Sequence, residues 1–381
     1  MKKILFFECA QNNGGARKAV VQMAKSLSGC YDVSIMDMYG SCKPFVDSCM
    51  ASGIDFKVFS NTDPHFIRSS KSKIEKLLNV FTFIPHMITQ GKKLKHYFKE
   101  KQIDYVCVST FRPLMYFLFA KPQAKVVFFA HGWYIKSQLS RFNSFLLKKR
   151  ADKIVGISQA TKQALYNNSI ASLSQLYVVH NSISVDVDVI KPALIEDSEN
   201  CIKILLCGGF TPGKGQSFAL DLADELNKRG VSFQLILAGI VYRGSSSQYF
   251  LKRMQKKTTE LGLDEKVLFI VDHDNVYDII KACDLVIHPS ETEGLPLSIM
   301  EAQLFKKPVI ANGVGGVIDL ISDRFTGYLP THNSVDEYAD IICEIEKNPQ
   351  SCDDIVNRAY SQIKQCYSPE EQKRELINVF K

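Results

Sequence analysis

Short apolar, β-branched or aromatic runs recur along this chain of 381 residues, and stretches with helical periodicity separate them. In the first half, the runs that predict strands lie at residues 3–7, 33–36, 56–59, 105–109, 125–130, 153–157 and 176–179. In the second half, they lie at residues 203–207, 234–238, 267–271, 285–288 and 308–311. Strands that alternate with helices are typical of βαβ units in a parallel sheet. We therefore predict an α/β protein with two doubly wound parallel sheets.

Two domains joined by a short linker fit this pattern. Residues 184–200 carry mixed small and acidic side chains and a proline, without the periodicity of either series. We predict a first domain over residues 1–183, a linker over 184–200 and a second domain over 201–364. In open α/β sheets, ligands bind beyond the carboxyl ends of the strands. The chemistry is therefore expected on the strand-to-helix loops.

The composition is that of a globular protein, with 46% hydrophobic and 23% charged residues. No apolar run approaches the about 18 residues that a membrane span requires, and Glu8 interrupts the apolar start before it has the length of a signal peptide. The 11 cysteines form no CxxC pairs, which favours reduced thiols over a disulfide framework or a zinc site. A cytoplasmic location is expected.

Positive charge is concentrated in the first half of the chain. Residues 1–200 hold 27 of the 47 Lys and Arg residues but only 15 of the 40 Asp and Glu residues. Such a field favours an anionic partner such as a membrane surface, although a solvated surface explains it equally well. The apolar residues 77–88 and the lysines of residues 92–101 predict either a helix on a membrane surface or a core helix beside a solvated segment. Aromatic platforms for RNA are not evident, so no nucleic-acid partner is expected.

Two glutamates flank the most informative loop of the sequence. Glu293 lies in the loop His-Pro-Ser-Glu-Thr-Glu-Gly-Leu-Pro, which follows a predicted strand, and Glu301 lies in the next helix. A loop carboxylate accepts hydrogen bonds from sugar hydroxyls, and a carboxylate two turns into the helix reaches a ribose. The free N–H groups near Leu297 and Ser298 point toward an anion. These features suit a nucleotide diphosphate sugar, although acidic residues at an ordinary helix start also explain them.

This stretch resembles the retaining GT-B glycosyltransferases of family 4. Their motif of two glutamates separated by seven residues matches Glu293-Gly294-Leu295-Pro296 and Glu301-Ala302, and a Val314-Gly315-Gly316 loop follows the next strand. The resemblance implies a GT-B fold, in which two Rossmann-like domains face a cleft and a C-terminal helix, here at about residues 365–381, packs on the first domain. It also implies sugar transfer from a nucleotide sugar with retention of configuration.

The loop from Cys207 to Gly215 reads Cys-Gly-Gly-Phe-Thr-Pro-Gly-Lys-Gly and connects a predicted strand to a helix. Its glycines and Lys214 suit a phosphate. A Walker A loop is disfavoured, because Gly215 stands where the Ser or Thr that binds Mg²⁺ belongs. The resembled family has G-R-x-x-x-x-K-G here, which implies that Lys214 contacts the donor diphosphate. This chain departs from the family at Gly209, where the arginine is missing.

The first strand-to-helix connection contains Gly14, Gly15 and Arg17. A glycine pair allows the backbone to approach a ligand, although a tight turn explains it as well. The family has a similar GGA loop, which implies a place near the donor for Gly15 and near the acceptor for Gly14 and Arg17. Arg17 is expected either to meet an acceptor phosphate or to be solvated.

Three further strand ends carry polar candidates. His131 follows a strand in Phe-Ala-His-Gly-Trp, which predicts a side chain displayed at the loop rather than buried, although a lone histidine is usually structural. The resemblance implies that His131 contacts the donor sugar. Ser158 and Asn181 also resemble strand ends of the family and are acceptor-side candidates.

The resulting hypothesis has His131 and Glu293 as catalytic residues, Lys214 on the diphosphate and Glu301 on the ribose. The other donor-binding candidates are Gly15, Gly209, Gly294, Leu295, Pro296, Leu297 and Ser298. No cofactor or metal is expected, because the D-x-D pairs at residues 186–188 and 272–274 lie in the linker and at a place that the resembled family does not use for metal.

The expected reaction moves a hexose or N-acetylhexosamine, with a UDP-sugar favoured, to a saccharide acceptor that is lipid-linked. A bacterial surface polysaccharide or lipopolysaccharide pathway is what the resemblance implies. A GDP-mannose-dependent mannosyltransferase and a non-catalytic nucleotide-sugar binding protein are the alternatives. An NAD-dependent dehydrogenase is disfavoured, because no G-x-G-x-x-G turn follows a strand.

Overall fold

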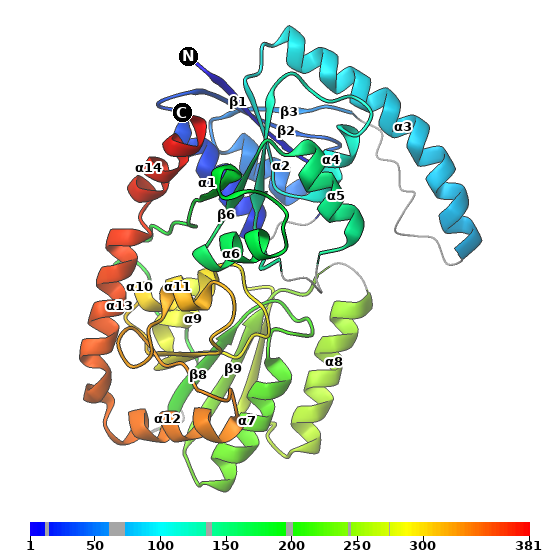
Figure 1. Ribbon diagram of the computed structural model, residues 1–381. Coiled ribbons are helices and arrows are strands. Elements are labelled where there is room, and N and C mark those ends of the chain that lie inside the picture. Colours follow the sequence, from blue (N-terminus) through cyan, green and yellow to red (C-terminus); the bar gives the residue numbers. More distant parts are fainter. Residues whose placement is uncertain (12–14, 61–72, 135–138, 196–200, 243–244, 274) are drawn as a thin grey trace. The chain divides into compact units, whose positions relative to one another are not determined.

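The computed structural model describes residues 1–11, 15–60, 73–134, 139–195, 201–242, 245–273 and 275–381, with the backbone alone for residues 73–82 and 245. The chain forms two compact units. Unit 1 comprises Met1–His180 and Gln372–Lys381, and unit 2 comprises Asn181–Glu371. Each unit contains one parallel sheet with helices packed against it (Figure 1). The predicted α/β class with two doubly wound sheets is confirmed.

The sheet of unit 1 has seven strands in the order β3-β2-β1-β4-β5-β6-β7. The strands are β1 (Lys3–Glu8), β2 (Asp32–Asp37), β3 (Asp55–Val58), β4 (Tyr105–Val108), β5 (Lys125–Ala130), β6 (Lys153–Gly156) and β7 (Leu176–Val178). The helices are α1 (Gly15–Leu27), α2 (Lys43–Met50), α3 (Lys73–Glu100), α4 (Phe111–Tyr116), α5 (Arg141–Arg150), α6 (Gln159–Asn167) and α14 (Pro369–Phe380). Every predicted strand of this half is present, within one residue at each end.

Both faces of this sheet are buried, as is usual for parallel sheets between helices. Ile4 and Phe6 of β1 pack on the face covered by α1, whereas Leu5 and Phe7 pack on the opposite face. Because side chains alternate along a strand, such a run must be apolar at every position. This explains why the strands appear in the sequence as continuous apolar runs.

Helix α3 is part of the unit 1 core over its described side chains. Phe83, Met87, Leu94 and Phe98 are buried, and the lysines between residues 92 and 99 are exposed. This is the core-helix interpretation of the segment, whereas the side chains of residues 77–82 lie outside the described residues. In the part of the chain that the structure describes, no helix has the length and apolar character needed to cross a membrane.

The C-terminal helix α14 belongs to unit 1, although the rest of the second half belongs to unit 2. Leu376, Val379 and Phe380 are fully buried on the α1 face of the sheet. Lys2 Nζ donates a hydrogen bond to the carbonyl of Phe380 at 2.7 Å. The chain therefore returns to the first sheet at its end.

Unit 2 has a five-stranded sheet in the order β10-β9-β8-β11-β12. The strands are β8 (Ile202–Cys207), β9 (Phe233–Gly239), β10 (Val267–Val271), β11 (Leu285–His288) and β12 (Val309–Ala311). The helices are α7 (Gln216–Lys228), α8 (Ser245–Glu260), α9 (Val276–Ala282), α10 (Leu297–Leu304), α11 (Val317–Leu320), α12 (Val335–Lys347) and α13 (Asp353–Cys366).

The segment before β8 is attached to unit 2 rather than free. Ala193 N–H donates to the carbonyl of Asp278, and Lys281 Nζ donates to the carbonyl of Val187, both at 2.9 Å. The structure divides the chain between His180 and Asn181, three residues before the predicted boundary.

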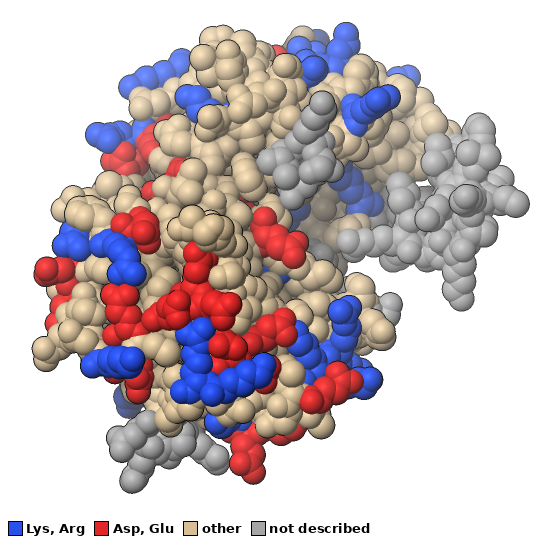
Figure 2. Space-filling view, turned by 60° about the horizontal axis from the view of Figure 1, so that its bottom comes forward, with Lys and Arg blue, Asp and Glu red and all other residues tan. Residues whose placement is uncertain are grey.

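Charged side chains of both signs gather on the outer face of unit 2 around α7 and α12 (Figure 2). Arg229, which follows α7, pairs with Glu225 at 2.7 Å and reaches across to Asp336 at 3.1 Å and Asp340 at 2.6 Å on α12. Such a surface network orients two helices and contributes little stability per pair. Arg229 therefore connects α7 to α12 through three carboxylates.

Candidate functional site

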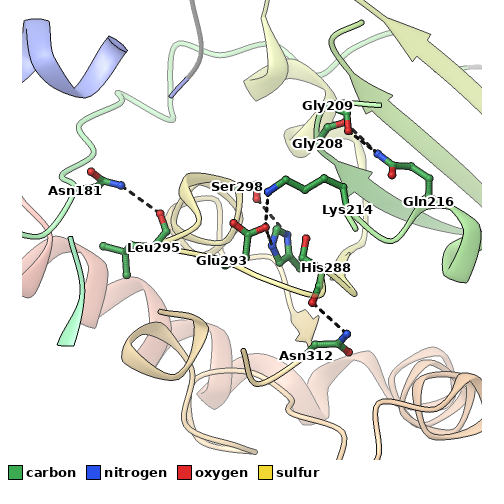
Figure 3. A network of polar contacts seen from close by, with 11 residues as sticks. Asn181, Gly208, Gly209, Lys214, Gln216, His288, Glu293, Leu295, Ser298 and Asn312 are labelled. Atoms are coloured by element: carbon green, nitrogen blue, oxygen red, sulfur yellow. Dashed lines mark hydrogen bonds and ion pairs between the residues drawn. The ribbon is translucent and has the colours of Figure 1, made fainter. Parts of the chain in front are cut away.

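Two loops of unit 2 lie together at the carboxyl edge of its sheet, because they follow the neighbouring strands β8 and β11. The first connects β8 to α7 and the second connects β11 to α10 (Figure 3). The N–H of Glu291 in the second loop donates to the carbonyl of Gly213 in the first at 2.9 Å. The two sequence motifs that carried the resemblance thus form one site.

Glu293 is the centre of a polar network in this site (Figure 3). Its Oε1 lies 2.7 Å from Nζ of Lys214 and 2.9 Å from Nε2 of His288. The other ring nitrogen of His288 lies 3.3 Å from the hydroxyl of Ser298, at the start of α10. Only 8% of Glu293 is exposed. Sequence reasoning identified Glu293, Lys214 and Ser298 but missed His288, whose place at the end of β11 was the available signal.

The environment of Glu293 favours the ionised carboxylate. Burial raises its pKa, but the hydrogen bonds and charges of His288 and Lys214 outweigh burial and lower the pKa to about 2. At neutral pH the carboxylate therefore only accepts hydrogen bonds. Its second oxygen, Oε2, has no recorded contact with Lys214 or His288.

The first loop requires glycine where its backbone turns. Gly213 and Gly215 have φ of +87° and +88°, in the left-handed region that side chains disfavour. A Cβ at Gly215 would also lie 2.6 Å from Cγ of Pro289. Gln216, the first residue of α7, donates to the carbonyls of Gly208 and Gly209 at 3.4 and 3.0 Å. The loop is thereby fixed with Lys214 directed to Glu293.

Side chains from elsewhere cover both glycines at the start of this loop. A Cβ at Gly208 would meet the side chain of Lys214 at 3.9 Å. A Cβ at Gly209 would lie 2.6 Å from Cε2 and 2.8 Å from the hydroxyl of Tyr242. Tyr242, from the loop after β9, therefore occupies the space beside Gly209, where the resembled family has an arginine side chain. Sequence reasoning missed it because nothing in the spacing of residues 209 and 242 indicates contact.

The second loop is held by amide side chains. Asn312 Nδ2 donates to the carbonyl of Ser290 at 3.3 Å, and the hydroxyl of Tyr338 donates to Asn312 Oδ1 at 2.9 Å. Asn181 Nδ2 donates to the carbonyl of Leu295 at 3.2 Å. The structure thus places Asn181, an acceptor-side candidate of the sequence hypothesis, beside the loop that carries Glu293.

Helix α10 begins without a side-chain cap. Pro296 is the N-cap residue, Gly294 and Leu295 before it are buried, and Leu297 and Ser298 form the first turn. The first N–H groups of a helix have no partner within the helix, so this end is suited to an anion. Glu301 is half-buried in the middle of α10, and its charge, after burial, helps to raise the pKa of Tyr277 to about 12. Glu301 therefore lies near Tyr277.

In unit 1, Arg17 is neither solvated nor available to a phosphate as expected. It is buried and forms an ion pair with Glu8, the last residue of β1, which is fully buried. Burial raises the pKa of Glu8 more than Arg17 lowers it. Sequence reasoning did not identify Glu8 as the partner of Arg17, although an acidic residue at the end of an apolar strand was a visible signal. Gly15 is the first residue of α1, and Gly14 lies outside the described residues.

His131 is less accessible than its place after β5 suggested. The residue is half-buried, and Nε2 is buried without a hydrogen-bond partner among the described residues. Burial, followed by the charge of Arg17, lowers the pKa of His131 to about 4. The ring is therefore neutral at physiological pH. Ser158 is fully buried as the N-cap of α6, where its hydroxyl accepts the N–H of Thr161 at 3.0 Å.

The described residues contain no group of three or more His, Cys, Asp or Glu side chains arranged to hold a metal ion. In the two D-x-D pairs, Asp186 accepts the N–H of Asp188 at 3.2 Å, and Asp272 accepts the N–H of Val241 at 3.0 Å. Asp274 lies outside the described residues. Asp186 thus stabilises a local turn, and Asp272 connects the end of β10 to the loop after β9.

Family models match both halves of the chain. The model "Glycosyl transferases group 1" matches residues 193–362, and the model "Glycosyltransferase Family 4" matches residues 45–187. Together they span most of both units.

The chain is also similar to individual proteins that are named as glycosyltransferases. An uncharacterized glycosyltransferase of Haemophilus influenzae is 24% identical over 92% of both chains. A UDP-Gal:alpha-D-GlcNAc-diphosphoundecaprenol alpha-1,3-galactosyltransferase of Escherichia coli is 30% identical over 23% of this chain and 22% of its own. Other curated relatives are matched over about half of their length.

Among solved structures, the fold is similar to that of Anabaena HepE in complex with UDP and glucose. The TM-score is 0.80 at 21% identity, and the similarity covers 100% of this chain and 99% of HepE. At this identity the likeness establishes the GT-B fold.

Proposed function

Because the chain belongs to the group 1, family 4 glycosyltransferases, we propose that it transfers a sugar from a nucleotide diphosphate sugar, which unit 2 binds, to a saccharide acceptor. The observation that carries this proposal is the convergence of Lys214, Glu293 and the uncapped start of α10 at one sheet edge. A cation and free helix N–H groups suit a diphosphate, and a buried carboxylate suits sugar hydroxyls.

The proposed donor contacts follow from this geometry. Lys214 has three N–H donors, so it can bind a phosphate oxygen while it keeps its hydrogen bond to Glu293. The first-turn N–H groups at Leu297 and Ser298 bind the other phosphate, and Glu301, two turns along α10, accepts from the ribose. A UDP-sugar is favoured because HepE, a structural neighbour of this chain, was solved with UDP and with UDP-glucose.

The sugar is proposed to be a hexose or an N-acetylhexosamine, transferred with retention of configuration. Glu293 stays ionised well below neutral pH and accepts hydrogen bonds from its hydroxyls. His131 acts as a neutral hydrogen-bonding partner, because an imidazole with a pKa of about 4 carries no charge under these conditions. We propose no metal in the reaction, since Lys214 and the helix start supply the positive potential for the diphosphate.

A lipid-linked saccharide is the proposed acceptor, in bacterial surface polysaccharide or lipopolysaccharide synthesis. The Escherichia coli relative acts, by its name, on a diphosphoundecaprenol-linked sugar. The proposed location is the cytoplasm, with peripheral contact to an anionic membrane. Phe142 and Phe145 of α5 support that contact, because they are 48% and 50% exposed on a helix that contains four basic residues and no acidic one.

Calorimetry with UDP, GDP, UDP-glucose, UDP-N-acetylglucosamine and GDP-mannose tests the donor assignment. We expect UDP and its sugars to bind, and Lys214→Met to weaken them while the exposed Lys256→Met does not. Preferential binding of GDP and GDP-mannose would instead support a mannosyltransferase of the same fold. A protein that binds no nucleoside diphosphate would contradict the proposal.

Donor hydrolysis separates an enzyme from a non-catalytic binding protein. Release of free sugar from the preferred donor, measured by NMR, is expected with the anomeric configuration retained in the first product. The same assay in EDTA should keep its rate. Complete loss of activity in EDTA would refute the metal-free mechanism, and binding without any turnover or acceptor transfer would favour the binding protein.

A further inference from the structure

His288 ends a strand that is otherwise apolar. Residues 285–287 of β11 are buried, and His288, the last residue of the strand, is only 5% exposed. Burial of an imidazole costs free energy unless its ring nitrogens form hydrogen bonds, whereas an apolar side chain is buried at no such cost. Packing of the sheet alone therefore does not account for a histidine at the end of β11.

Both ring nitrogens of His288 have partners in the site (Figure 3). Nε2 lies 2.9 Å from Oε1 of Glu293, and Nδ1 lies 3.3 Å from the hydroxyl of Ser298. The ionised carboxylate of Glu293 only accepts hydrogen bonds, so Nε2 carries a hydrogen atom. In the neutral ring, Nδ1 is then the acceptor, and the hydroxyl of Ser298 donates to it. We call this directed chain of hydrogen bonds, from Ser298 through His288 to Glu293, the His288 relay.

The His288 relay joins the two parts of the proposed donor site. Ser298 lies in the first turn of α10, whose N–H groups are suited to a phosphate, and Glu293 is suited to sugar hydroxyls. Because the hydroxyl of Ser298 directs its hydrogen atom to Nδ1, it does not serve as a donor to the phosphate. The phosphate then meets the backbone N–H groups of the first turn.

Two donors of different rigidity hold one oxygen of Glu293. Nζ of Lys214 and Nε2 of His288 both reach Oε1, at 2.7 and 2.9 Å, and neither contacts Oε2. The side chain of Lys214 is partly exposed on a flexible four-carbon stem, whereas the imidazole is buried and held at its other nitrogen. The direction of the carboxylate is therefore set by the imidazole more than by the lysine.

We propose that His288 is a positioning residue for sugar transfer, which fixes Oε1 of Glu293, leaves Oε2 to a hydroxyl group of the donor sugar and holds this carboxylate in place relative to the phosphate-binding start of α10. The inference rests on the proposed glycosyltransferase function and deepens it. It assigns a role to a side chain that does not contact the donor itself.

His288→Leu removes both hydrogen bonds and keeps a buried apolar side chain. UDP contains no sugar to meet Glu293, so calorimetry should give a Kd for UDP within about twofold of the wild-type value. Hydrolysis of UDP-glucose should lose about 10- to 100-fold in kcat/KM, as expected for one hydrogen bond to a charged group. His332→Leu, which removes an exposed histidine–glutamate pair of the same unit, is the matched control and should change neither value.

The pH profile of hydrolysis separates positioning from a loss of packing. The charged groups recorded at Glu293 are His288 at the end of β11 and Lys214 in the loop before α7, and together they lower its pKa to about 2. Without His288, Lys214 alone opposes burial, so the pKa of Glu293 rises. Relative to the wild type, His288→Leu should therefore lose further activity as the pH is lowered from about 8 to about 5. His288→Gln keeps an amide N–H that can reach Glu293 and should recover part of the activity.

Ser298→Ala tests the other end of the His288 relay, and it also decides the question if His288→Leu does not fold. It should lower hydrolysis about fivefold, because the imidazole loses one hydrogen bond, and leave the Kd of UDP unchanged. Equal losses of UDP affinity and hydrolysis in either variant, or parallel pH profiles in His288→Leu and the wild type, would overturn the relay. A wild-type protein that does not bind UDP, or that binds it without hydrolysing UDP-glucose, would instead contradict the proposed function itself.

Discussion

The two units each bury a glutamate beside one long cation, yet the two carboxyl groups differ in acidity. Glu8 pairs with Arg17 in unit 1, and Glu293 pairs with Lys214 in unit 2. Burial raises the pKa of Glu8 despite Arg17, whereas the pKa of Glu293 is lowered to about 2 despite its burial. The same residue type in the same kind of pair therefore ends on opposite sides of its ordinary value.

The difference lies in the number of hydrogen bonds and in the access of water. One oxygen of Glu293 receives both Lys214 and His288, and the side chain of Lys214 is 36% exposed. Glu8 has a single cationic partner that is itself buried, and Arg17 and Ser109 lower its pKa less than burial raises it. A buried carboxylate is thus stabilised when several donors share it, and one buried cation does not offset desolvation.

The largest effect is expected for Arg17→Met. It removes the cation that pairs with Glu8 and should lower the free energy of unfolding of unit 1 by about 3–5 kcal/mol, as for other broken buried pairs. This loss of stability should be smaller at pH 5 than at pH 8, because protonation removes the unpaired charge of Glu8 in part of the molecules. Hydrogen exchange of the β1 and β4 amides measures it.

The double variant Glu8→Gln/Arg17→Met is the control for this pair. Because it removes both charges, most of the lost stability should return. A single variant as stable as the wild type would show that Glu8 is protonated in the native protein, which would weaken the comparison with Glu293.

The second effect is a pH dependence of opposite sign in the two units. Because the pKa of Glu293 is lowered in the folded protein, its carboxylate stabilises unit 2 at pH values above 4.5, the pKa of the unfolded chain. This stabilisation is lost as the pH falls toward 2. The contribution is at most about 3 kcal/mol, because the partly exposed Lys214 is screened by water. The raised pKa of Glu8 acts in the other direction, so unit 1 loses stability as the pH rises above 4.5.

Glu293→Gln isolates this contribution. Its unit 2 should show a flatter stability profile between pH 4.5 and 2 than the wild type, as measured by hydrogen exchange of β8 and β11. Parallel acid profiles in the variant and the wild type would mean that Glu293 is not held ionised by His288 and Lys214.

Lys214→Met should affect ligand binding far more than stability. Its pair with Glu293 is partly exposed, so the change in unfolding free energy is expected below about 1 kcal/mol. The loss of a charge-assisted hydrogen bond to a phosphate should weaken UDP binding by about 10- to 100-fold in calorimetry. An unaltered affinity for UDP would place the diphosphate elsewhere.

The fold and the unit 2 side of this comparison, Glu293 with Lys214, were predictable from the sequence. Continuous apolar runs fix the strands, since parallel strands are buried on both faces, and every run was located within one residue at each end. The Glu293 loop and the Lys214 loop were found because glycine, proline and charged residues follow predicted strands at a fixed distance. Motifs of this kind can be found in a sequence because their residues lie close together along the chain.

The contacts that depend on separate elements were not predictable. The partners of Glu8 and His288 depend on which strands are neighbours, and the order β2-β1-β4-β5 cannot be obtained from periodicity. Arg17 was expected in contact with solvent or phosphate because its charge is visible in the sequence and its buried partner is not. Burial of a charged residue is decided by tertiary packing, which a single sequence does not display.

The smallest effect on ligand binding is expected for substitution of Tyr242. This residue lies at the open site of unit 2, in contrast to the closed surroundings of Glu8 in unit 1. Glu8 is fully buried, whereas the loop beside Glu293 presents the half-buried phenol of Tyr242 next to Gly209. If this hydroxyl contacts the diphosphate, Tyr242→Phe should weaken UDP binding about fivefold, and Tyr249→Phe, on the exposed face of α8, should not. Introduced into the wild-type protein, Gly209→Ala should weaken UDP binding, because the added methyl group displaces the ring of Tyr242. Introduced into Tyr242→Ala, it should have little effect, because no ring is present to displace. If the losses of UDP affinity in Gly209→Ala and Tyr242→Ala were additive in the double variant, Tyr242 would fill space beside the loop without contacting the ligand.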